Sequence, residues 1–421
     1  MGMNSIEKII AHHSGKDTVV PGEIVDTSVD LVMTNDCNTA LNYDILRNKI
    51  GVKKVWDPSR IIMFIDHYVP CNSVESGEYH KRMRQFAREQ GVTNTHEGEG
   101  ICHQIMLERY VVPGQLILGA DSHTCTYGAL GAISIGMGST DIAVSWVDGT
   151  IWLKVPETIR VDLEGRLPSG VFSKDVILKV IGDLTARGAT YKAVEFSGQG
   201  VHDMSIGARA TMCNMVIEAG GKCAYVQPDE KTLEYIQKRG RESLEVFQPD
   251  ADARYERVLR YNLADLEPQI AYPHSVENVK PLSEFEGLEI DEAFIGACTN
   301  GRLEDLQIAA NILKGRRASP NVRLLVTPAS REVYRQALDT GLLNIFLDAG
   351  AMINNPGCGA CYGAVQGILA SGERLISTAN RNFRGRVGSP ESEIYLGSPA
   401  TVAASAIHGK ITDPRKVVQN D

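Results

Sequence analysis

The sequence lacks an uninterrupted apolar run of the about eighteen residues that a membrane-spanning helix requires. Even the apolar stretch 111–137 is broken by Asp121, Ser122 and His123. The N-terminus also lacks the basic and then apolar segments of a secretory signal. We therefore expect a cytoplasmic protein that has no membrane partner.

An excess of positive charge, low-complexity tracts and short repeats are also missing from the sequence. Its 43 Lys and Arg residues against 52 Asp and Glu residues give a net charge of -9, which repels phosphate backbones and anionic lipid. We therefore expect no nucleic-acid partner. The 421 residues, 43% of them hydrophobic, are enough for roughly three domains with buried cores.

The nine cysteines are an odd number in a chain without a secretory signal, so a disulfide framework is not expected. Some thiols are instead candidates for metal binding. Six of the nine lie in unremarkable surroundings and are predicted to be small apolar fillers. These six are Cys37, Cys71, Cys102, Cys125, Cys213 and Cys223.

Alternating helical and strand patterns predict an α/β fold. Residues 7–14 and 174–186 have helical patterns, while residues 31–33, 60–65, 115–118 and 290–295 are typical of short buried strands. The alternation in residues 152–165 indicates the start of a new unit, and the polar run 248–285 is expected to be a surface connection. We predict three α/β/α domains at residues 1–155, 156–283 and 284–421.

Polar clusters follow several predicted strands, where loops of α/β folds place ligands. Asp66 and His67 follow one strand, and Asp121 and His123 follow another, so each pair joins a carboxylate to an imidazole for acid–base chemistry. His103 lies in the glycine-flanked segment GEGICHQI. A single histidine is more often structural, but three in one predicted domain favour a functional site. The remaining histidines are predicted to be surface or packing residues: His12, His13, His80, His96, His202, His274 and His408.

The segment 354–363 holds a CxxC pair, Cys358 and Cys361, among glycines that permit tight turns. Two thiolates are too few for a closed zinc site or an iron–sulfur cubane, and Cys298, after a predicted strand, is the best candidate for a third ligand. Three thiolates on a cubane would leave one iron able to act as a Lewis acid. A redox dithiol or a pair of structural cysteines remains the alternative interpretation.

Arg381 and Arg386 lie in the segment 378–386, and two guanidiniums can clamp a dicarboxylate. A solvated arginine loop is the alternative interpretation. The glycine run 128–138 matches a dinucleotide-binding loop poorly.

Several motifs together resemble the aconitase superfamily, and within it the branch of isopropylmalate dehydratase and homoaconitase large subunits. The resemblance runs nearly end to end. The motifs are DHxxP at 66–70, HQI at 103–105, GADSHT at 119–124, CNM at 213–215, GACTN at 296–300, PGCGAC at 356–361 and NRNFxGR at 380–386.

This resemblance implies roles for the matching residues. Cys298, Cys358 and Cys361 would ligate a [4Fe-4S] cluster with one iron not ligated by protein. The implied catalytic residues are Asp66 and His67, which would protonate the leaving hydroxyl, with His103, Asp121, His123 and Glu218. The implied substrate-binding residues are Ser122, Asn214, Asn380, Arg381 and Arg386.

The resemblance also implies a reaction and a partner. The chain ends at Asp421, where related single-chain enzymes continue into a swivelling domain, so we expect a separate small subunit that supplies the catalytic serine. The implied reaction isomerises a small hydroxy acid by dehydration and rehydration, with 3-isopropylmalate and 2-isopropylmalate in leucine biosynthesis as the first choice. The alternatives are a homoaconitase, a dimethylmalate or methylmalate dehydratase, a non-catalytic iron sensor that binds RNA, and a zinc scaffold.

Overall fold

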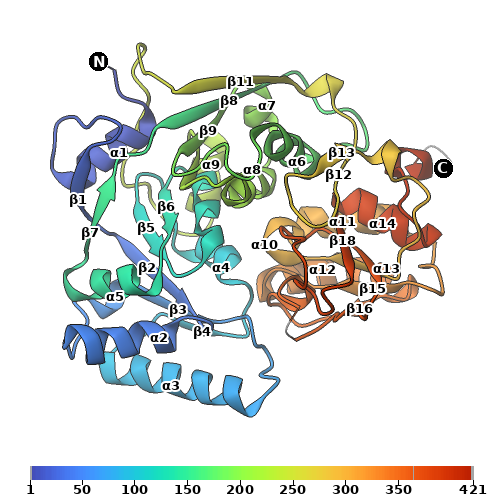
Figure 1. Cartoon of the computed structure of the whole chain (residues 1–421), viewed down its shortest axis with the longest axis horizontal. Coiled ribbons are helices and arrows are strands. Elements are labelled where there is room, and N and C mark those ends of the chain that lie inside the picture. The colour runs from blue at the N-terminus through green and yellow to red at the C-terminus, as the bar shows by residue number, and fades with distance from the viewer. Residues whose placement is uncertain (1, 364, 419–421) are drawn as a thin grey trace. The chain divides into compact units, whose positions relative to one another are not determined.

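The computed structural model describes residues 2–363 and 365–418, which form two units (Figure 1). Unit 1 holds the described residues up to Glu97, with Ile105–Glu164 and Ala189–Tyr261. Unit 2 holds Gly98–Gln104, Gly165–Gly188 and the described residues from Asn262 onward. The division into three domains at 155 and 283 stays a prediction.

A five-stranded parallel sheet organises unit 1, in the order β4-β3-β2-β5-β6. Three of its strands confirm predicted strands, and the bounds differ by no more than two residues. The strands are β2 (Leu31–Asn35), β3 (Ile61–Ile65), β4 (Thr95–Glu97), β5 (Leu116–Gly119) and β6 (Ile133–Gly136).

Two smaller sheets complete the strands of unit 1. One pairs β1 (Ile24–Ser28) with β7 (Thr150–Lys154) in antiparallel fashion. The other has the order β10-β9-β8-β11 and contains β8 (Thr158–Glu164), β9 (Ala193–Ser197), β10 (Cys223–Val226) and β11 (Arg257–Asn262).

Helices of unit 1 contribute side chains such as Ile6, Ala40 and Ile142 to one apolar core. Phe86 and Trp146, from two different helices, stack with ring centroids 5.1 Å apart in that core. The helices, one of which continues from unit 2, are α1 (Ser5–Ser14), α2 (Thr39–Asp44), α3 (Val74–Gln90), α4 (Cys102–Arg109), α5 (Ser139–Asp148), α7 (Gln199–Asp203), α8 (Ile206–Asn214) and α9 (Glu230–Gln237).

Helix α1 shows why a predicted helix forms where it does. Asn4 accepts a hydrogen bond from the backbone N–H of Glu7, and Glu7 accepts one from the backbone N–H of Asn4, so two end groups are satisfied reciprocally. Gly15 ends the helix with a φ of 68°, which costs glycine little. The helix predicted at 7–14 is therefore confirmed, and it begins two residues earlier.

Unit 2 is built on a seven-stranded sheet with the order β13-β12-β18-β17-β14-β15-β16. The five strands from β18 to β16 are parallel, and β12 and β13 add an antiparallel edge. The strands are β12 (Gln269–Ala271), β13 (Val279–Pro281), β14 (Glu292–Ile295), β15 (Arg323–Val326), β16 (Met352–Ile353), β17 (Arg374–Ser377) and β18 (Glu393–Leu396).

The helices of unit 2 close a second apolar core, in which Leu306, Phe346 and Ala403 are fully buried. The helix predicted at 174–186 and the strand predicted at 290–295 are confirmed as α6 and β14. The helices are α6 (Ser173–Leu184), α10 (Ala297–Asn300), α11 (Leu303–Leu313), α12 (Arg331–Asp339), α13 (Leu342–Asp348), α14 (Pro399–His408) and α15 (Pro414–Val418). Together with the parallel strands of both units, these helices confirm the predicted α/β class.

Two expectations from the sequence are wrong. The run 248–285, predicted to be a surface connection, contains β11, β12 and β13, and β12 is fully buried. The prediction missed these short strands because prolines and charged residues interrupt their patterns. Cys37 and Cys71, predicted to be apolar fillers, are exposed, whereas Cys102, Cys125, Cys213 and Cys223 are buried as predicted.

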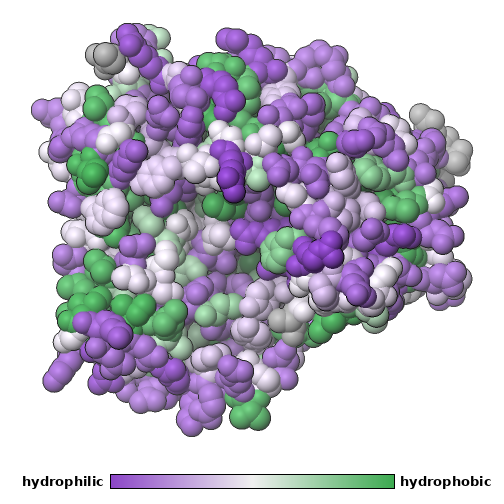
Figure 2. All heavy atoms as spheres, in the orientation of Figure 1, coloured by the Kyte–Doolittle hydropathy of each residue, from purple (hydrophilic) through white to green (hydrophobic). Residues whose placement is uncertain are grey.

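Among the described residues, no helix is long and apolar enough to cross a membrane. Figure 2 shows one face of the molecule on which hydrophilic side chains predominate and hydrophobic ones form small groups.

We expect Gly128→Ala to destabilise unit 1. Gly128 lies in the 3-10 helix Ser122–Leu130, and a Cβ there would come within 2.0 Å of the backbone oxygen of Ala224 on β10. Such overpacking should lower the free energy of unfolding by about 1–3 kcal/mol, measured by urea denaturation. Gly77→Ala is the matched control, because nothing lies within 4 Å of a Cβ at this position in α3. It should raise stability by up to about 1 kcal/mol, and equal effects of the two substitutions would contradict the expectation.

Candidate functional site

In unit 2, three strands of the parallel part of the sheet lead into the loops that carry the predicted cluster residues. Cys298 follows β14, Asn380 follows β17, and the segment with Cys358 and Cys361 follows β16. Because these strands are parallel, their carboxyl ends meet at one edge of the sheet. Cys298 and Asn380, which are 82 positions apart in the sequence, are thereby gathered into one region.

The CxxC pair is held in a tight turn. Gly359–Cys361 form a short 3-10 helix, and the backbone N–H of Cys361 donates to the oxygen of Cys358 at 3.1 Å. Residues three apart in a 3-10 helix lie above one another, so the two cysteine side chains share one side of the turn. Gly359 has a φ of 55°, and a Cβ there would lie 2.7 Å from Oγ1 of Thr327, so this turn requires glycine.

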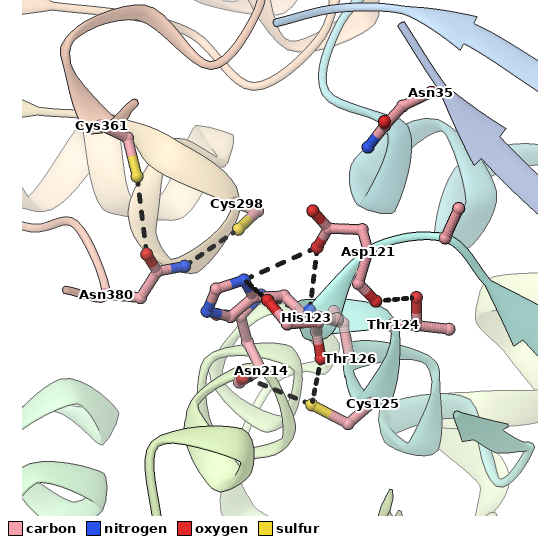
Figure 3. A network of polar contacts seen from close by, with 12 residues as sticks. Asn35, Asp121, His123, Thr124, Cys125, Thr126, Asn214, Cys298, Cys361 and Asn380 are labelled. Atoms are coloured by element: carbon pink, nitrogen blue, oxygen red, sulfur yellow. Dashed lines mark hydrogen bonds and ion pairs between the residues drawn. The ribbon is translucent and has the colours of Figure 1, made fainter. Parts of the chain in front are cut away.

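One amide group links two of the three predicted cysteine ligands (Figure 3). Nδ2 of Asn380 donates to Sγ of Cys298 at 3.3 Å, and Oδ1 of Asn380 accepts from Sγ of Cys361 at 3.5 Å. Arg386 donates from Nε to the backbone oxygen of Cys361 at 2.9 Å. The structure therefore brings together Cys298, Cys361, Asn380 and Arg386.

A buried arginine holds the loop that carries Cys298. Arg302 donates to the backbone oxygens of Cys298 and Thr299, at 2.6 and 2.5 Å. Ala297 has a φ of 70°, a conformation that side chains other than glycine rarely adopt. The guanidinium contacts therefore hold a strained turn that aims Cys298 at the edge of the sheet.

Lys174, at the start of α6, is a completely buried ammonium group in the same unit. Its Nζ donates to the backbone oxygens of Thr378 and Ala379, at 2.8 and 2.6 Å, directly before Asn380. Burial lowers the pKa of Lys174 to about 7, although ionisation of nearby Cys361 and Cys298 would raise it. An anionic group bound by these thiols would therefore stabilise the charged lysine.

In unit 1, the predicted acid–base pair lies at the end of β3. Nδ1 of His67 donates to Oδ1 of Asp66 at 2.8 Å, and Asp66 is almost completely buried. An ionised carboxylate can only accept, so Nδ1 carries the proton in this contact. Asp66 thereby sets the tautomer and the orientation of the His67 ring.

The second histidine of unit 1 lies between carboxylates from two segments. Nε2 of His123 is 2.8 Å from Oε1 of Glu218, and Nδ1 is 3.6 Å from Oδ1 of Asp121 and 3.3 Å from Oγ of Ser122. Asp121 also accepts from the backbone N–H of His123, which starts the 3-10 helix Ser122–Leu130. The structure thus joins four predicted site residues in a polar cluster that can hold and transfer a proton.

The remaining predicted site residues have other placements. Asn214 is buried at the end of α8 and donates from Nδ2 to Oγ1 of Thr126 at 2.8 Å (Figure 3). His103 is buried in the first turn of α4, within the part of that helix that belongs to unit 2. Arg381 is half-buried directly after Asn380. The catalytic role of His103 stays a prediction.

The sequence interpretation missed several residues that contact these groups. Asp36 and His80 are buried beside His67, while Lys174 and Arg302 hold the cysteine loops. Asp36 directly follows β2, whose first three residues are apolar, so the signal used for Asp66 was present there too. Nothing in the sequence distinguishes His80, Lys174 and Arg302 from ordinary polar residues.

A sequence model of the aconitase family (aconitate hydratase) matches residues 7–288 and 280–409. The chain belongs to the aconitase family. It is 52% identical to a protein from Methanothermobacter thermautotrophicus named probable 3-isopropylmalate dehydratase large subunit, over 98% of this chain and 99% of that protein.

Two further relatives match as completely. A 3-isopropylmalate dehydratase large subunit from Methanopyrus kandleri is 51% identical, over 99% of both chains. A protein from Methanothermobacter thermautotrophicus named probable methanogen homoaconitase large subunit is 47% identical, again over 99% of both chains. The predicted superfamily is therefore confirmed.

Membership of this family implies a [4Fe-4S] cluster. The residues of unit 2 fit such a group. Thiolates are the protein ligands of these clusters, and three cysteines follow two parallel strands of one sheet, β14 and β16, whose carboxyl ends lie at the same edge. Lys174 is buried with only two backbone oxygens as acceptors among the described residues, and an anionic cluster would supply its counter-charge.

We expect Lys174→Met, which removes the charge and keeps the apolar stem, to be more destabilising at pH 9 than at pH 7 in the metal-free chain. The pKa of Lys174 is about 7 in the folded chain and about 10.5 in the unfolded chain. The unfolded chain therefore binds more protons between these values, so the natural chain gains stability as the pH rises. The difference should grow by up to about 1.4 kcal/mol per pH unit, measured by urea denaturation.

Lys179→Met is the control for this lysine experiment. Lys179 lies on the same helix, and its half-exposed ammonium pairs with Asp183 at 2.7 Å. Its replacement should have a small effect that is similar at both pH values. An equal loss in the free energy of unfolding of Lys174→Met at pH 7 and pH 9 would contradict the lowered pKa of Lys174 in the folded chain.

Proposed function

We propose that this chain is the large subunit of an iron–sulfur hydro-lyase that interconverts 2-isopropylmalate and 3-isopropylmalate by dehydration and rehydration. The observation that carries the proposal is 50–52% identity, over nearly the whole chain, to four proteins named 3-isopropylmalate dehydratase large subunit, one of them as probable. The relative named homoaconitase large subunit, at 47% identity, makes a homoaconitase reaction the second candidate.

The proposed cluster ligands are Cys298, Cys358 and Cys361, which leave one iron without a protein ligand. When bound, such a cluster supplies a Lewis acid that polarises the carbon–oxygen bond of a substrate hydroxyl. The amide of Asn380 donates from Nδ2 to Sγ of Cys298, a contact that a thiolate ligand can keep. The guanidiniums of Arg381 and Arg386 are proposed to bind the carboxylates of the substrate, which matches their charge and forked geometry.

His67 is the proposed acid that protonates the leaving hydroxyl, which then departs as water. Because Nδ1 keeps its proton for Asp66, His67 acts as the acid in its doubly protonated form and transfers the proton on Nε2, which leaves the neutral ring protonated at Nδ1. In rehydration the same nitrogen takes a proton back from water. His103 and the cluster of Asp121, Ser122, His123 and Glu218 supply further acid–base and hydrogen-bonding groups, and Asn214 stays a proposed substrate residue.

A small subunit is proposed to complete the enzyme, because the relatives are named as large subunits and match this chain over almost their full length. Its proposed contribution is the serine that removes the proton from the carbon next to the departing hydroxyl. The side chain that separates isopropylmalate from homocitrate would be recognised largely by that subunit.

We expect each of Cys298→Ser, Cys358→Ser and Cys361→Ser to lose iron and acid-labile sulfide after anaerobic reconstitution of the purified chain. Loss of one thiolate leaves too few ligands for a stable cluster. Cys71→Ser, at an exposed position, is the control and should keep the complement of the natural chain. Bound zinc, or an iron content that none of the three substitutions changes, would refute the proposed ligand set.

We expect the reconstituted chain, mixed with the small subunit from the same source, to convert isopropylmalate faster than homocitrate, citrate or dimethylmalate. The rate of formation of the unsaturated acid is the measurement. His67→Asn should lower kcat roughly 10²–10⁴-fold through loss of the acid, whereas His12→Asn, on exposed α1 surface, should not. Preference for homocitrate would favour the second candidate, and no turnover of any of these acids would refute the proposal.

A further inference from the structure

A carboxylate that follows β2 lies against the proposed acid His67 in unit 1. Oδ1 of Asp36 accepts from the backbone N–H of His67 at 3.2 Å, and Oδ2 accepts from the backbone N–H of Tyr68 at 2.9 Å. Asp36 thus holds both peptide groups at the point where the chain turns after β3. Its side chain is inaccessible to solvent.

The same carboxylate approaches the ring of His67. Oδ1 of Asp36 lies 3.4 Å from Nδ1 of His67, the nitrogen that donates to Asp66 at 2.8 Å. Two carboxylates therefore surround one N–H group, so the tautomer with the proton on Nδ1 is favoured twice.

A second histidine fixes Asp36 from the opposite side. Nε2 of His80, in α3, lies 3.2 Å from Oδ2 of Asp36, and only 3% of His80 is exposed. His80 shares the buried face of α3 with Met83 and Ala87, a spacing that is typical of core residues. A polar ring in this position is explained by the carboxylate that it binds, because a buried ion needs hydrogen bonds.

These contacts keep Asp36 charged. Burial alone would raise its pKa, but hydrogen bonds from His67 and His80 outweigh burial and hold the pKa well below its usual range. A neutral amide could not replace the carboxylate here, because one of its two atoms would become a donor facing N–H groups.

We propose that Asp36, held by His80, is a positioning residue that fixes the backbone of His67 and keeps a proton on Nδ1, so that Nε2 is the nitrogen that gives and takes back the transferred proton. The inference rests on the proposed function, in which His67 is the acid. Asp36 acts through His67. It supplies a second support from β2 and α3, in addition to the neighbouring Asp66.

The test combines kinetics with a measurement that needs no substrate. In the complex with the small subunit, Asp36→Asn should lower kcat roughly 10- to 100-fold with KM within about twofold, since a misplaced acid slows the chemical step more than binding. In 15N-histidine spectra of the full chain, the natural protein should show His67 protonated at Nδ1. Asp36→Asn should shift or broaden this signal.

Asp30→Asn is the matched control. Asp30 precedes β2 where Asp36 follows it, accepts from the backbone N–H of Leu116 at 2.8 Å, and lies 3.4 Å from Nε2 of His13. The Asp30→Asn variant therefore loses the same charge as Asp36→Asn and a comparable pair of contacts, but at the other end of β2. Its kcat and the His67 signal should remain unchanged.

Substitutions of His80 keep the test decisive if Asp36→Asn fails to fold. His80→Gln retains an N–H donor for Asp36 and should preserve both readouts. His80→Phe retains the ring volume but no donor, and should change the His67 signal and lower kcat in the same direction as Asp36→Asn, by a smaller factor.

A kcat of Asp36→Asn equal to that of Asp30→Asn, with an unchanged His67 signal, would overturn the inference and leave Asp36 as a residue that only closes a turn. If the natural complex turns over none of the hydroxy acids, the proposed function fails and the spectra alone decide. An altered His67 signal in Asp36→Asn then supports the positioning role, and an unaltered one refutes it.

Discussion

Parallel strand pairing is the constraint on which both sets of proposed chemical groups depend. In unit 2, the register of β17, β14, β15 and β16 makes their carboxyl ends coincide, so Cys298, Cys361 and Asn380 meet although the sequence separates them widely. In unit 1, β3, β2 and β5 impose the same arrangement on the loops that follow them. Neither set could form from local sequence alone, since no segment carries all of its members.

Each set is supported by a buried ionisable side chain that binds two backbone groups. Lys174 binds two backbone oxygens beside Asn380, and Asp36 binds two backbone N–H groups at His67 and Tyr68. An unpaired buried charge is costly, so these contacts resist rearrangement of the loops. The positive ion lies with the thiols and the negative ion with the histidines, so each charge complements the groups near it.

Much of the fold follows from local patterns. The helix predicted at 7–14 has an end-capping pair at Asn4 and Glu7. The strands β3 and β5, and the first three residues of β2, are short apolar runs that the sequence pattern identified. The strands within 248–285 were not predicted because prolines and charged residues interrupt their patterns. His80 was predicted to be a surface or packing residue because no polar cluster adjoins it in the sequence, and only the structure shows its contact with Asp36.

The sequence by itself determined the α/β class, the family and the candidate residues, because ordered motifs such as GACTN and PGCGAC survive without any knowledge of their neighbours. Only the tertiary structure decided which side chains touch. Glu218 pairs with His123, Asn380 links Cys298 to Cys361, and Asp36 supports His67. Hydrogen bonds form only between atoms about 3 Å apart. The chain brings these atoms together by packing distant strands and helices, so the order of the residues does not identify the pairs.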